Sequence, residues 1–388
     1  MRRLDKRSLA LILVAMMVTS PALIAQQTDD GEWIFKVKPK QKLRVDVETG
    51  GNITIVGWKR NEVKVIARPE WGSQDDVDVE VVKTSYGVKI RTSTPFRWRD
   101  MGWGRNNPDV HFTINIPDKF DVELESHGGD LFIKGVEGEF EGQTMGGDLD
   151  LEDLRGDVDL GTMGGDITIR ESRLDGRVHT MGGDVELYNV SGGVRGSTMG
   201  GDVRYSGENK DKASDPIRIS TMGGDINVED APSGGEMKTM GGDITVRSAG
   251  AYISARTMGG DIEIERLDGG VRATTMGGDI EIRMVGDVTK KDRSVEIISK
   301  GGDVTLIVPE NLSMTVDITI SFSRRGRRSN RRVSIESDFD LTIEESDEGR
   351  DRWGQSRRYI YGKGVFGSGK NKVHIETVNG RVILRKGK

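Results

Sequence analysis

Apolar and polar residues alternate along most of the chain, and one short alternation returns at a fixed interval. After each copy of the pentapeptide Thr-Met-Gly-Gly-Asp comes an aliphatic residue, a polar residue and a second apolar residue, as in Leu149-Asp150-Leu151. Alternation with period two is typical of a strand with one buried face. A weaker strand precedes each threonine, as in Val158-Asp159-Leu160, and a second turn is expected at Leu154-Arg155-Gly156. Each unit therefore predicts strand, turn, strand, turn.

The pentapeptide occurs eight times, almost always eighteen residues apart, and degenerate copies flank it at 126–130 and 299–303. The copies begin at Thr144, Thr162, Thr180, Thr198, Thr221, Thr239, Thr257 and Thr275. A fixed short period marks an architecture in which each unit buries its apolar face on its neighbours. An antiparallel meander would need a separate cover for its apolar face, and no helical segment is available for that. We therefore predict an all-β, single-stack β-solenoid of the β-helix or β-roll type, with 18-residue two-strand repeats and β-rich terminal caps. A twisted multi-strand sandwich is the alternative.

The organisation expected along the chain has four parts. Residues 1–25 are a signal peptide, 26–125 an N-terminal β-rich cap, 126–303 the Gly-Gly-Asp repeat array and 304–388 a C-terminal β-rich cap. Weakened forms of the motif at 48–55 and 376–383 indicate terminal variants that close the array. Two intervals are longer than eighteen residues, and their extra residues fall at 206–215 and 287–294, on the side opposite the Gly-Gly turns.

The first residues predict export. Arg2, Arg3, Lys6 and Arg7 precede the apolar stretch Leu9–Val18, and the small residue Ala25 offers a cleavage site. An uncleaved anchor is the alternative, although 9–25 is short for a span of roughly 20 residues. We expect a protein of the periplasm, outer envelope or cell surface of a bacterium, with no transmembrane span after cleavage.

Composition narrows the chemistry. The chain of 388 residues has no cysteine, which excludes disulfides, thiolate metal sites and thiol catalysis. Removing residues 1–25 moves the formal charge from −6 to −9. A mildly acidic surface argues against bulk nucleic-acid binding, and no nucleic-acid partner is expected.

Each residue type of the pentapeptide has a structural and a functional interpretation. The glycines permit a tight turn through positive φ. The stacked carboxylates cap turn N–H groups or, in a calcium-binding β-roll, recruit calcium. That alternative would use Asp148, Asp166, Asp184, Asp202, Asp225, Asp243, Asp261 and Asp279. One Asp per coil supplies few of the six to eight oxygens that calcium takes. The threonines predict a ladder of hydroxyls that bond to the neighbouring rung.

The methionines invite a soft-metal interpretation, because thioethers bind Cu(I). We expect them instead to fill space where a strand enters its turn. No metal and no cofactor are expected.

No catalytic constellation is recognisable. The four histidines, His111, His127, His179 and His374, have no metal-ligand spacing. A polysaccharide-active β-helix enzyme is a further alternative, because such enzymes place acids on a solenoid face. A non-enzymatic protein is the prediction.

Two clusters outside the array are the candidate binding residues. The first is an aromatic and basic segment that contains Arg97, Trp98, Arg99 and Trp103, and the second contains Arg324, Arg325, Arg327 and Arg328. Aromatic faces stack on sugars, and Arg or Trp also suit anionic lipid head groups. The alternatives are a plug for the end of the solenoid and a solvated hairpin tip.

The chain resembles a bacterial family known as putative adhesins, exported β-strand-repeat proteins. The resemblance depends on 43–55, on the Gly-Gly-Asp-aliphatic repeats, and on Thr377-Val378-Asn379-Gly380-Arg381-Val382. It implies a β-solenoid or β-sandwich and offers no family catalytic residues. The resulting hypothesis is an exported, non-enzymatic, adhesin-like scaffold or binding protein of the cell envelope. Its partner would be an envelope glycan, a lipid head group or another surface protein.

Overall fold

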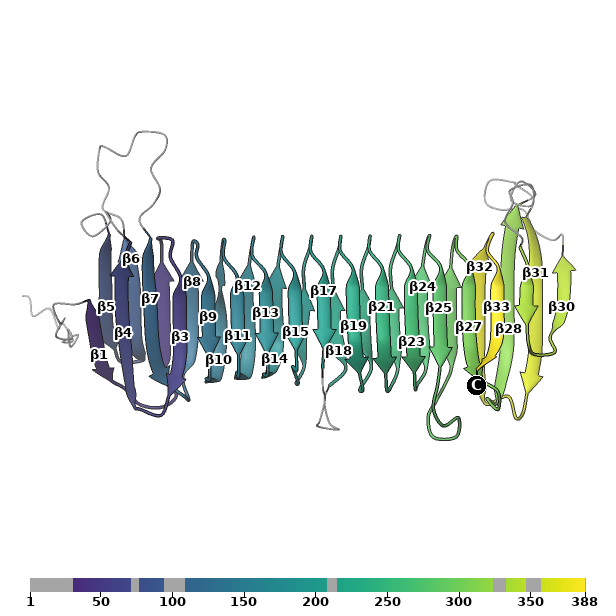
Figure 1. Cartoon of the computed structure of the whole chain (residues 1–388), viewed down its shortest axis with the longest axis horizontal. Helices are drawn as coiled ribbons and strands as arrows, with labels where there is room; N and C mark the ends of the chain where they lie inside the picture. The colour runs from purple at the N-terminus through teal and green to yellow at the C-terminus, as the bar shows by residue number, and fades with distance from the viewer. Residues whose placement is uncertain are drawn as a thin grey trace, which may run out of the picture.

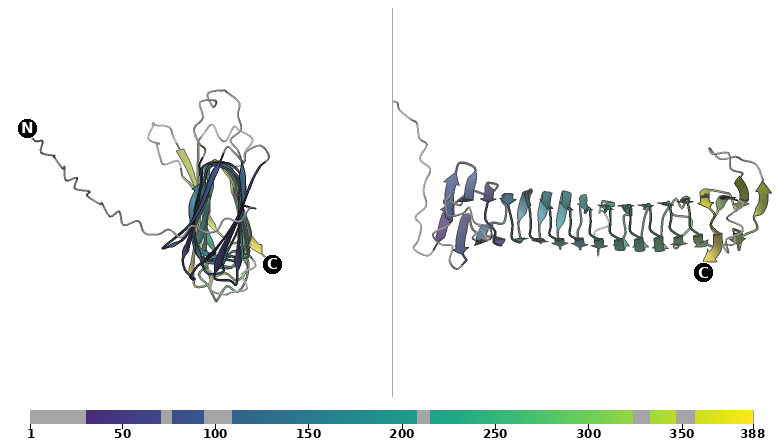
Figure 2. Two further views of the ribbon diagram at one scale, coloured as in Figure 1. Left: turned by 90° about the vertical axis from the view of Figure 1, so that its left-hand side faces the viewer. Right: turned by 90° about the horizontal axis from the view of Figure 1, so that it is seen from above.

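Two long β-sheets face each other along a straight stack in the computed structural model (Figure 1). The structure describes residues 31–70, 77–93, 109–207, 215–323, 333–346 and 357–387. Viewed down its long axis, the stack is a flattened ring of strands, and viewed from above it is two parallel rows (Figure 2). The described residues form strands and turns and contain no helix. This confirms the prediction of an all-β fold.

The first sheet has sixteen strands in the described part of the chain. In spatial order they are β1 (Glu32–Lys36), β4 (Glu62–Pro69), β7 (Val110–Pro117), β3 (Ile53–Trp58), β9 (Leu131–Lys134), β11 (Leu149–Glu152), β13 (Ile167–Arg170), β15 (Val185–Tyr188), β17 (Val203–Ser206), β19 (Ile226–Ala231), β21 (Ile244–Ala249), β23 (Ile262–Leu267), β25 (Ile280–Met284), β27 (Val304–Pro309), β33 (Val382–Gly387) and β29 (Ile335–Ser337).

The strands of the second sheet pair in a matching sequence. They are β5 (Asp78–Thr84), β6 (Gly87–Ser93), β2 (Lys42–Val47), β8 (Asp121–Ser126), β10 (Glu137–Thr144), β12 (Arg155–Thr162), β14 (Arg173–Thr180), β16 (Val194–Ser197), β18 (Ile217–Ser220), β20 (Gly235–Lys238), β22 (Ile253–Arg256), β24 (Val271–Thr275), β26 (Val295–Ser299), β32 (Asn371–Val378), β28 (Met314–Ser323), β31 (Arg357–Phe366) and β30 (Thr342–Ser346).

Successive repeats stack as parallel strands in register. Leu149 lies opposite Ile167, which lies opposite Val185, so equivalent positions of each repeat form rows along both sheets. The aliphatic residues predicted to point inward are buried between the sheets, with exposed fractions of 0–3% from Leu149 to Ile282. Burying each such side chain contributes about 1.5–3 kcal/mol. The parallel pairing confirms a solenoid-like stack and contradicts a meander.

Chain order and spatial order differ at both ends. The strands β2 and β3 lie between β8–β9 and the outer strands β6–β7, and β32 and β33 lie between β26–β27 and the outer strands β28–β29. The weakened motifs at 48–55 and 376–383 belong to these inserted rungs. They continue the array, but one further parallel rung lies beyond each, followed by antiparallel strands. Antiparallel pairs occur only near the ends of the described stack, as in β4–β7 and β28–β31.

The two long edges of the stack are built differently. The edge formed by the Thr-Met-Gly-Gly-Asp turns is called the Gly-Gly edge below, and the other is called the opposite edge. The insertion at 287–294 leaves from the opposite edge, as predicted (Figure 1). The turn expected at Leu154-Arg155-Gly156 is wrong, because β12 already begins at Arg155. The turn lies earlier, between the end of β11 at Glu152 and the start of β12, and it contains Asp153 with a φ of 50°.

The predicted signal peptide, residues 1–25, lies outside the described residues. Among the residues that are described, no helix is long and apolar enough to cross a membrane.

Candidate functional site

The threonine row supports the Gly-Gly edge from inside. All eight threonines are buried, with exposed fractions of 0–4%. From Thr162 onward each hydroxyl donates to the carbonyl oxygen of the second glycine one rung earlier, as Thr180 Oγ1 does to Gly165 at 2.8 Å. The same hydroxyl accepts the N–H of the second glycine in its own turn, as from Gly183 at 3.3 Å. This confirms that the hydroxyls bond to the neighbouring rung, with backbone groups as the partners.

The aspartates form a second ladder on the same edge. In each rung one carboxylate oxygen accepts the backbone N–H of the Asp in the next rung, at 2.7–2.8 Å from Asp148 to Asp279. The ladder continues through the longer intervals and ends where Arg381 N–H donates to Asp303. The prediction that these carboxylates cap turn N–H groups is confirmed, and six of the eight are exposed. Within the described residues no three His, Cys, Asp or Glu side chains are grouped to hold an ion.

The second glycine of each pair is required for close packing. A Cβ on Gly165 would lie 2.1 Å from the carbonyl oxygen of Gly147, and the later turns repeat this close approach. Positive φ, which we predicted as the reason for the glycines, occurs in the eight turns only at Gly147. The correct reason is the stacking of one turn directly on the next. The first glycine is less restricted, because the nearest atom to an added Cβ is 3.8 Å away at Gly164 and 3.1–3.5 Å away in the six later turns.

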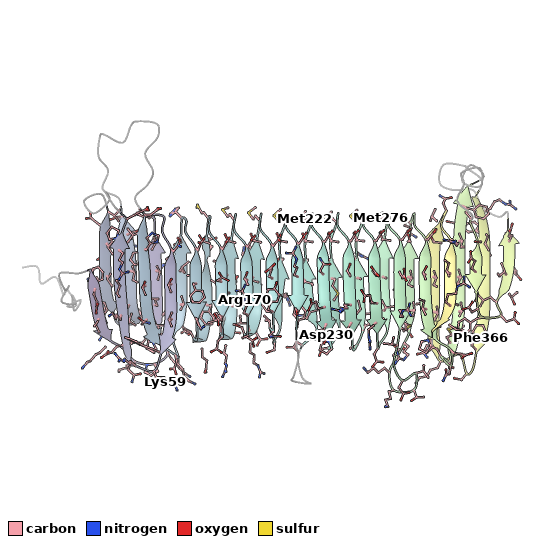
Figure 3. The ribbon with its side chains drawn as sticks, in the orientation of Figure 1. Lys59, Arg170, Met222, Asp230, Met276 and Phe366 are labelled. Atoms are coloured by element: carbon pink, nitrogen blue, oxygen red, sulfur yellow. The ribbon has the colours of Figure 1, made fainter. Side chains whose placement is uncertain are left out.

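The methionines do not fill the core. All eight are exposed, with exposed fractions between 46% and 55%, and Figure 3 shows Met222 and Met276 on the Gly-Gly edge. The prediction that they fill space at the turn is therefore wrong. Period-two alternation decides which strand residues point inward, but the methionine stands in the turn, where that rule no longer applies.

The N-terminal end of the second sheet carries a basic groove of about 510 Å³. Its main lining residues are Lys40, Lys42, Arg44, Tyr86, Lys89 and Glu123. Tyr86 stands in the turn between β5 and β6 with 80% of its surface exposed, and its carbonyl oxygen accepts the N–H of Lys42 at 2.9 Å. This backbone bond places the turn that carries Tyr86 beside the cations. We call these six residues the basic groove.

The charges of the basic groove are unbalanced. Arg44 lies directly opposite Lys89 across the β2–β6 pair, and like charges in that position destabilise a sheet. Glu123 is the one carboxylate of the lining, 3.4 Å from Lys42 Nζ and 3.3 Å from Arg44 Nε. Burial alone lowers the pKa of Lys42, but the Glu123 carboxylate together with Glu141, 3.6 Å from Lys42 Nζ, and Glu139 outweighs it, so the pKa is raised and the ammonium stays charged. The groove can hold an anion.

A clasp of charged residues closes the insertion on the opposite edge. Arg293 is fully buried and pairs with Asp268, while its two terminal nitrogens donate to the carbonyl oxygens of Val285 and Asp287. Lys291 pairs with the same Asp268 at 2.8 Å. These contacts hold the insertion against the stack.

The predicted binding residues Arg97, Trp98, Arg99 and Trp103 lie outside the described residues, as do Arg324, Arg325, Arg327 and Arg328. The strands that flank them are described. Thr92, near the end of β6, is 3.4 Å from Thr49 hydroxyl to hydroxyl, so β6 ends at the Gly-Gly edge. At the other end of the stack, the backbone carbonyl oxygen of Ser321 in β28 accepts the N–H of Asn379, which lies in the corresponding turn.

The histidines are distributed along the whole stack. His374 lies 3.2 Å from Glu376 and 3.7 Å from Asp317, and His111 Nδ1 accepts the N–H of Asn52. None of these contacts pairs a histidine with a hydroxyl nucleophile.

Sequence reasoning missed the basic groove. Lys42, Arg44 and Lys89 are ordinary outward positions of two alternating strands, and the intervening segments give no sign that these strands pair. The available signal was the pair of basic residues Lys42 and Arg44 on one strand face, together with the aromatic residue Tyr86 beside Gly87, where a turn is expected.

The chain is similar to three solved structures at low sequence identity. The structure of a protein described as a putative cell adhesion protein from Clostridium sporogenes ATCC 15579 is 13% identical, with 92% of this chain and 99% of that chain covered and a TM-score of 0.17. Two proteins described as putative adhesins, from Bacteroides fragilis NCTC 9343 and Parabacteroides distasonis ATCC 8503, are 16% and 11% identical. Each covers 71% of this chain and 95% of its own, with a TM-score of 0.29. No curated protein matches the chain. The Toastrack DUF4097 family matches residues 25–248 and 200–385, and the chain therefore belongs to that family.

Proposed function

We propose that this protein is an exported, non-enzymatic scaffold of the bacterial cell envelope that binds an anionic envelope polymer or lipid head group at its N-terminal end. The observation that carries the proposal is the basic groove, a surface lined by four cations, one carboxylate and an exposed tyrosine. The stack supports it mechanically, because in-register rungs joined on both sheets make a stiff body suited to holding a site at one end.

The composition of the groove selects the class of ligand. The tyrosine ring offers an apolar face to a sugar ring, while Lys40, Lys89 and Arg44 offer charge to phosphate or carboxylate groups. The leader predicted at residues 1–25 would deliver the chain to the compartment where such polymers occur. The aromatic segment with Trp98 and Trp103 follows β6, the strand that also supplies Lys89. We propose it as a second contact, with the cluster at Arg324 serving the other end.

The experiment measures binding of the purified chain to anionic envelope glycans and to vesicles with anionic lipids. Replacing Tyr86 and Lys89 by alanine removes the ring and one cation, and we expect affinity to fall about tenfold, equivalent to about 1.4 kcal/mol. Binding should also weaken as salt rises, because exposed charges are screened within about 10 Å at 0.1 M.

Tyr252 supplies the matched control. It is exposed too, at 54%, but it stands in the middle of the stack between β21 and β22, away from the groove. Replacing Tyr252 by alanine should leave affinity unchanged. Equal affinity of the wild type and the Tyr86–Lys89 variant would overturn the groove as the contact. If affinity fell only in a variant with Trp98→Ala and Trp103→Ala, the aromatic segment would be the binding contact in place of the basic groove.

A further inference from the structure

The exposed methionines form an apolar row along the Gly-Gly edge of the described stack. The eight residues are Met145, Met163, Met181, Met199, Met222, Met240, Met258 and Met276. The three other methionines in the described part of the chain, Met237, Met284 and Met314, are buried with exposed fractions of 0–2%. This fold therefore buries methionine where packing is its role, and the row on the Gly-Gly edge needs another explanation.

The row is held in register by the backbone on both sides. Met163 N–H donates to the carbonyl oxygen of Thr144, and the carbonyl oxygen of Met163 accepts from Gly182 at 3.1 Å. Later turns repeat the second bond, up to Gly259 and Met240. Consecutive methionines are thus one rung apart, about 4.8 Å. Each side chain rotates about three bonds, so two neighbouring sulfurs can converge on one point.

The first glycine of each pair leaves the sulfurs accessible. Sterics favour glycine here only in part, because an added Cβ would meet nothing closer than 3.8 Å at Gly164 but would lie 3.1–3.5 Å from a backbone oxygen in the six later turns. Glycine stands at this position in all eight turns. A bare position beside each thioether keeps the row open to solvent. The result is a narrow ridge one side chain wide, which is a poor shape for burying a protein surface.

We propose that the methionine row binds soft monovalent cations, Cu(I) or Ag(I), with each ion held by two or more thioethers from successive rungs. Thioethers are soft ligands that select such ions over hard cations, and no thiol competes because the chain has no cysteine. The carboxylate row on the same edge adds negative charge that attracts a cation without offering it a soft ligand.

An imidazole extends the row at its N-terminal end. His127 occupies the methionine position in the rung before Met145 and is exposed. Its Nδ1 lies 3.4 Å from the carbonyl oxygen of Val47, which favours the tautomer with Nε2 free to coordinate. The opposite end of the row has Lys300 in this position. At the N-terminal end, the imidazole of His127 can therefore take the place of one thioether in a site shared with Met145. This inference does not depend on the proposed function, because it concerns another edge of the stack.

The experiment titrates the purified full chain with Cu(I) under anaerobic, reducing conditions against a chromogenic Cu(I) chelator, and with Ag(I) alone by calorimetry. With two or more sulfurs for each ion, eight thioethers hold at most four ions. Replacing Met181, Met199, Met222 and Met240 by leucine keeps the row apolar and removes four sulfurs, and the number of bound ions should fall by about half. Because leucine keeps the surface apolar, this variant separates a role of the sulfurs from a role of the apolar surface. Unchanged binding of Cu(I) and Ag(I) would overturn the proposal.

The buried methionines provide the control. Replacing Met237 and Met284 by leucine should leave the number of bound ions unchanged, and a loss in this variant would contradict the assignment to the edge. A measurement on the wild type is independent of folding in any variant. With methyl-labelled methionine, Ag(I) should shift the NMR signals of the exposed row and leave those of Met237, Met284 and Met314 in place. Retention of all copper by the chelator, or equal shifts of buried and exposed signals, would reject the site.

Discussion

The Gly-Gly edge and the opposite edge close the same rungs by different means. On the Gly-Gly edge every turn has the same length. Its threonine and aspartate bond to the turn before it, and the N–H of its second glycine bonds to the threonine of the same turn. The opposite edge absorbs both longer intervals, of 23 and 24 residues, while the Asp ladder passes through them unchanged. An edge built from contacts between consecutive backbones has no room for an extra residue. An edge without such a ladder can accept insertions and then needs side chains to secure them.

The largest expected effect lies on the opposite edge, where one buried residue secures the insertion at 287–294. Replacing Arg293 by alanine leaves the carbonyl oxygens of Val285 and Asp287 without this donor, and leaves Asp268 with Lys291 as its remaining cation. Removing one member of a buried pair costs about 3–5 kcal/mol. We expect the lower limit, about 3 kcal/mol, because Asp268 is partly exposed. The measurement is the free energy of unfolding in urea.

Arg272 is the control for this variant. It pairs with Glu296 at 3.2 Å, but both side chains are exposed. Replacing Arg272 by alanine should change the free energy of unfolding by less than about 0.5 kcal/mol. Equal losses for Arg293→Ala and Arg272→Ala would show that burial of the clasp contributes nothing.

The next effect tests the Gly-Gly edge with two glycines of one turn. In Gly165→Ala the new Cβ would lie 2.1 Å from a backbone oxygen that cannot rotate away. Overpacking of this kind costs about 1–3 kcal/mol, and a rigid backbone neighbour argues for at least about 2 kcal/mol. Gly164→Ala, one residue earlier, meets only ordinary contact at 3.8 Å and should cost less than about 0.5 kcal/mol. The measurement is the midpoint of thermal unfolding of both variants. Equal midpoints would contradict the explanation that the second glycine is required because each turn stacks directly on the one before it.

The comparison of the edges also shows how far sequence alone could go. Alternation placed Leu149, Ile167 and their equivalents inside, because a strand residue has only two sides to choose from. The same rule could not place Met145 or its equivalents, since a turn residue has no alternating partner. The reason for the second glycine was missed as well. Its close approach to the previous turn exists only after the rungs are stacked.

The ends of the stack were less predictable than its middle. In the array each strand pairs with the strand one repeat away, so chain order gives spatial order. Strand β2 instead lies between β6 and β8, separated from them by more than thirty residues of chain. That long-range pairing brings Arg44 beside Lys89 and creates the basic groove. No periodic signal in the sequence marks such a pairing, and the candidate site at this end was therefore found only in the structure.

The smallest expected effect is a pH dependence that also belongs to the opposite edge. Burial alone raises the pKa of Asp268, but hydrogen bonds from Lys291 and Arg293 outweigh it, and the pKa is lowered. A carboxyl with a lower pKa in the folded state contributes stability above its unfolded value, about 3.9, and loses it as the pH falls through the folded value. We expect the clasp to contribute about 1 kcal/mol after solvent screening. The difference in unfolding free energy between wild type and Asp268→Asn should be constant from pH 7 to 5 and shrink below pH 4. A difference that stays constant down to pH 2 would mean that the charge of Asp268 does not secure the insertion, and that the two edges are held equally by their backbones.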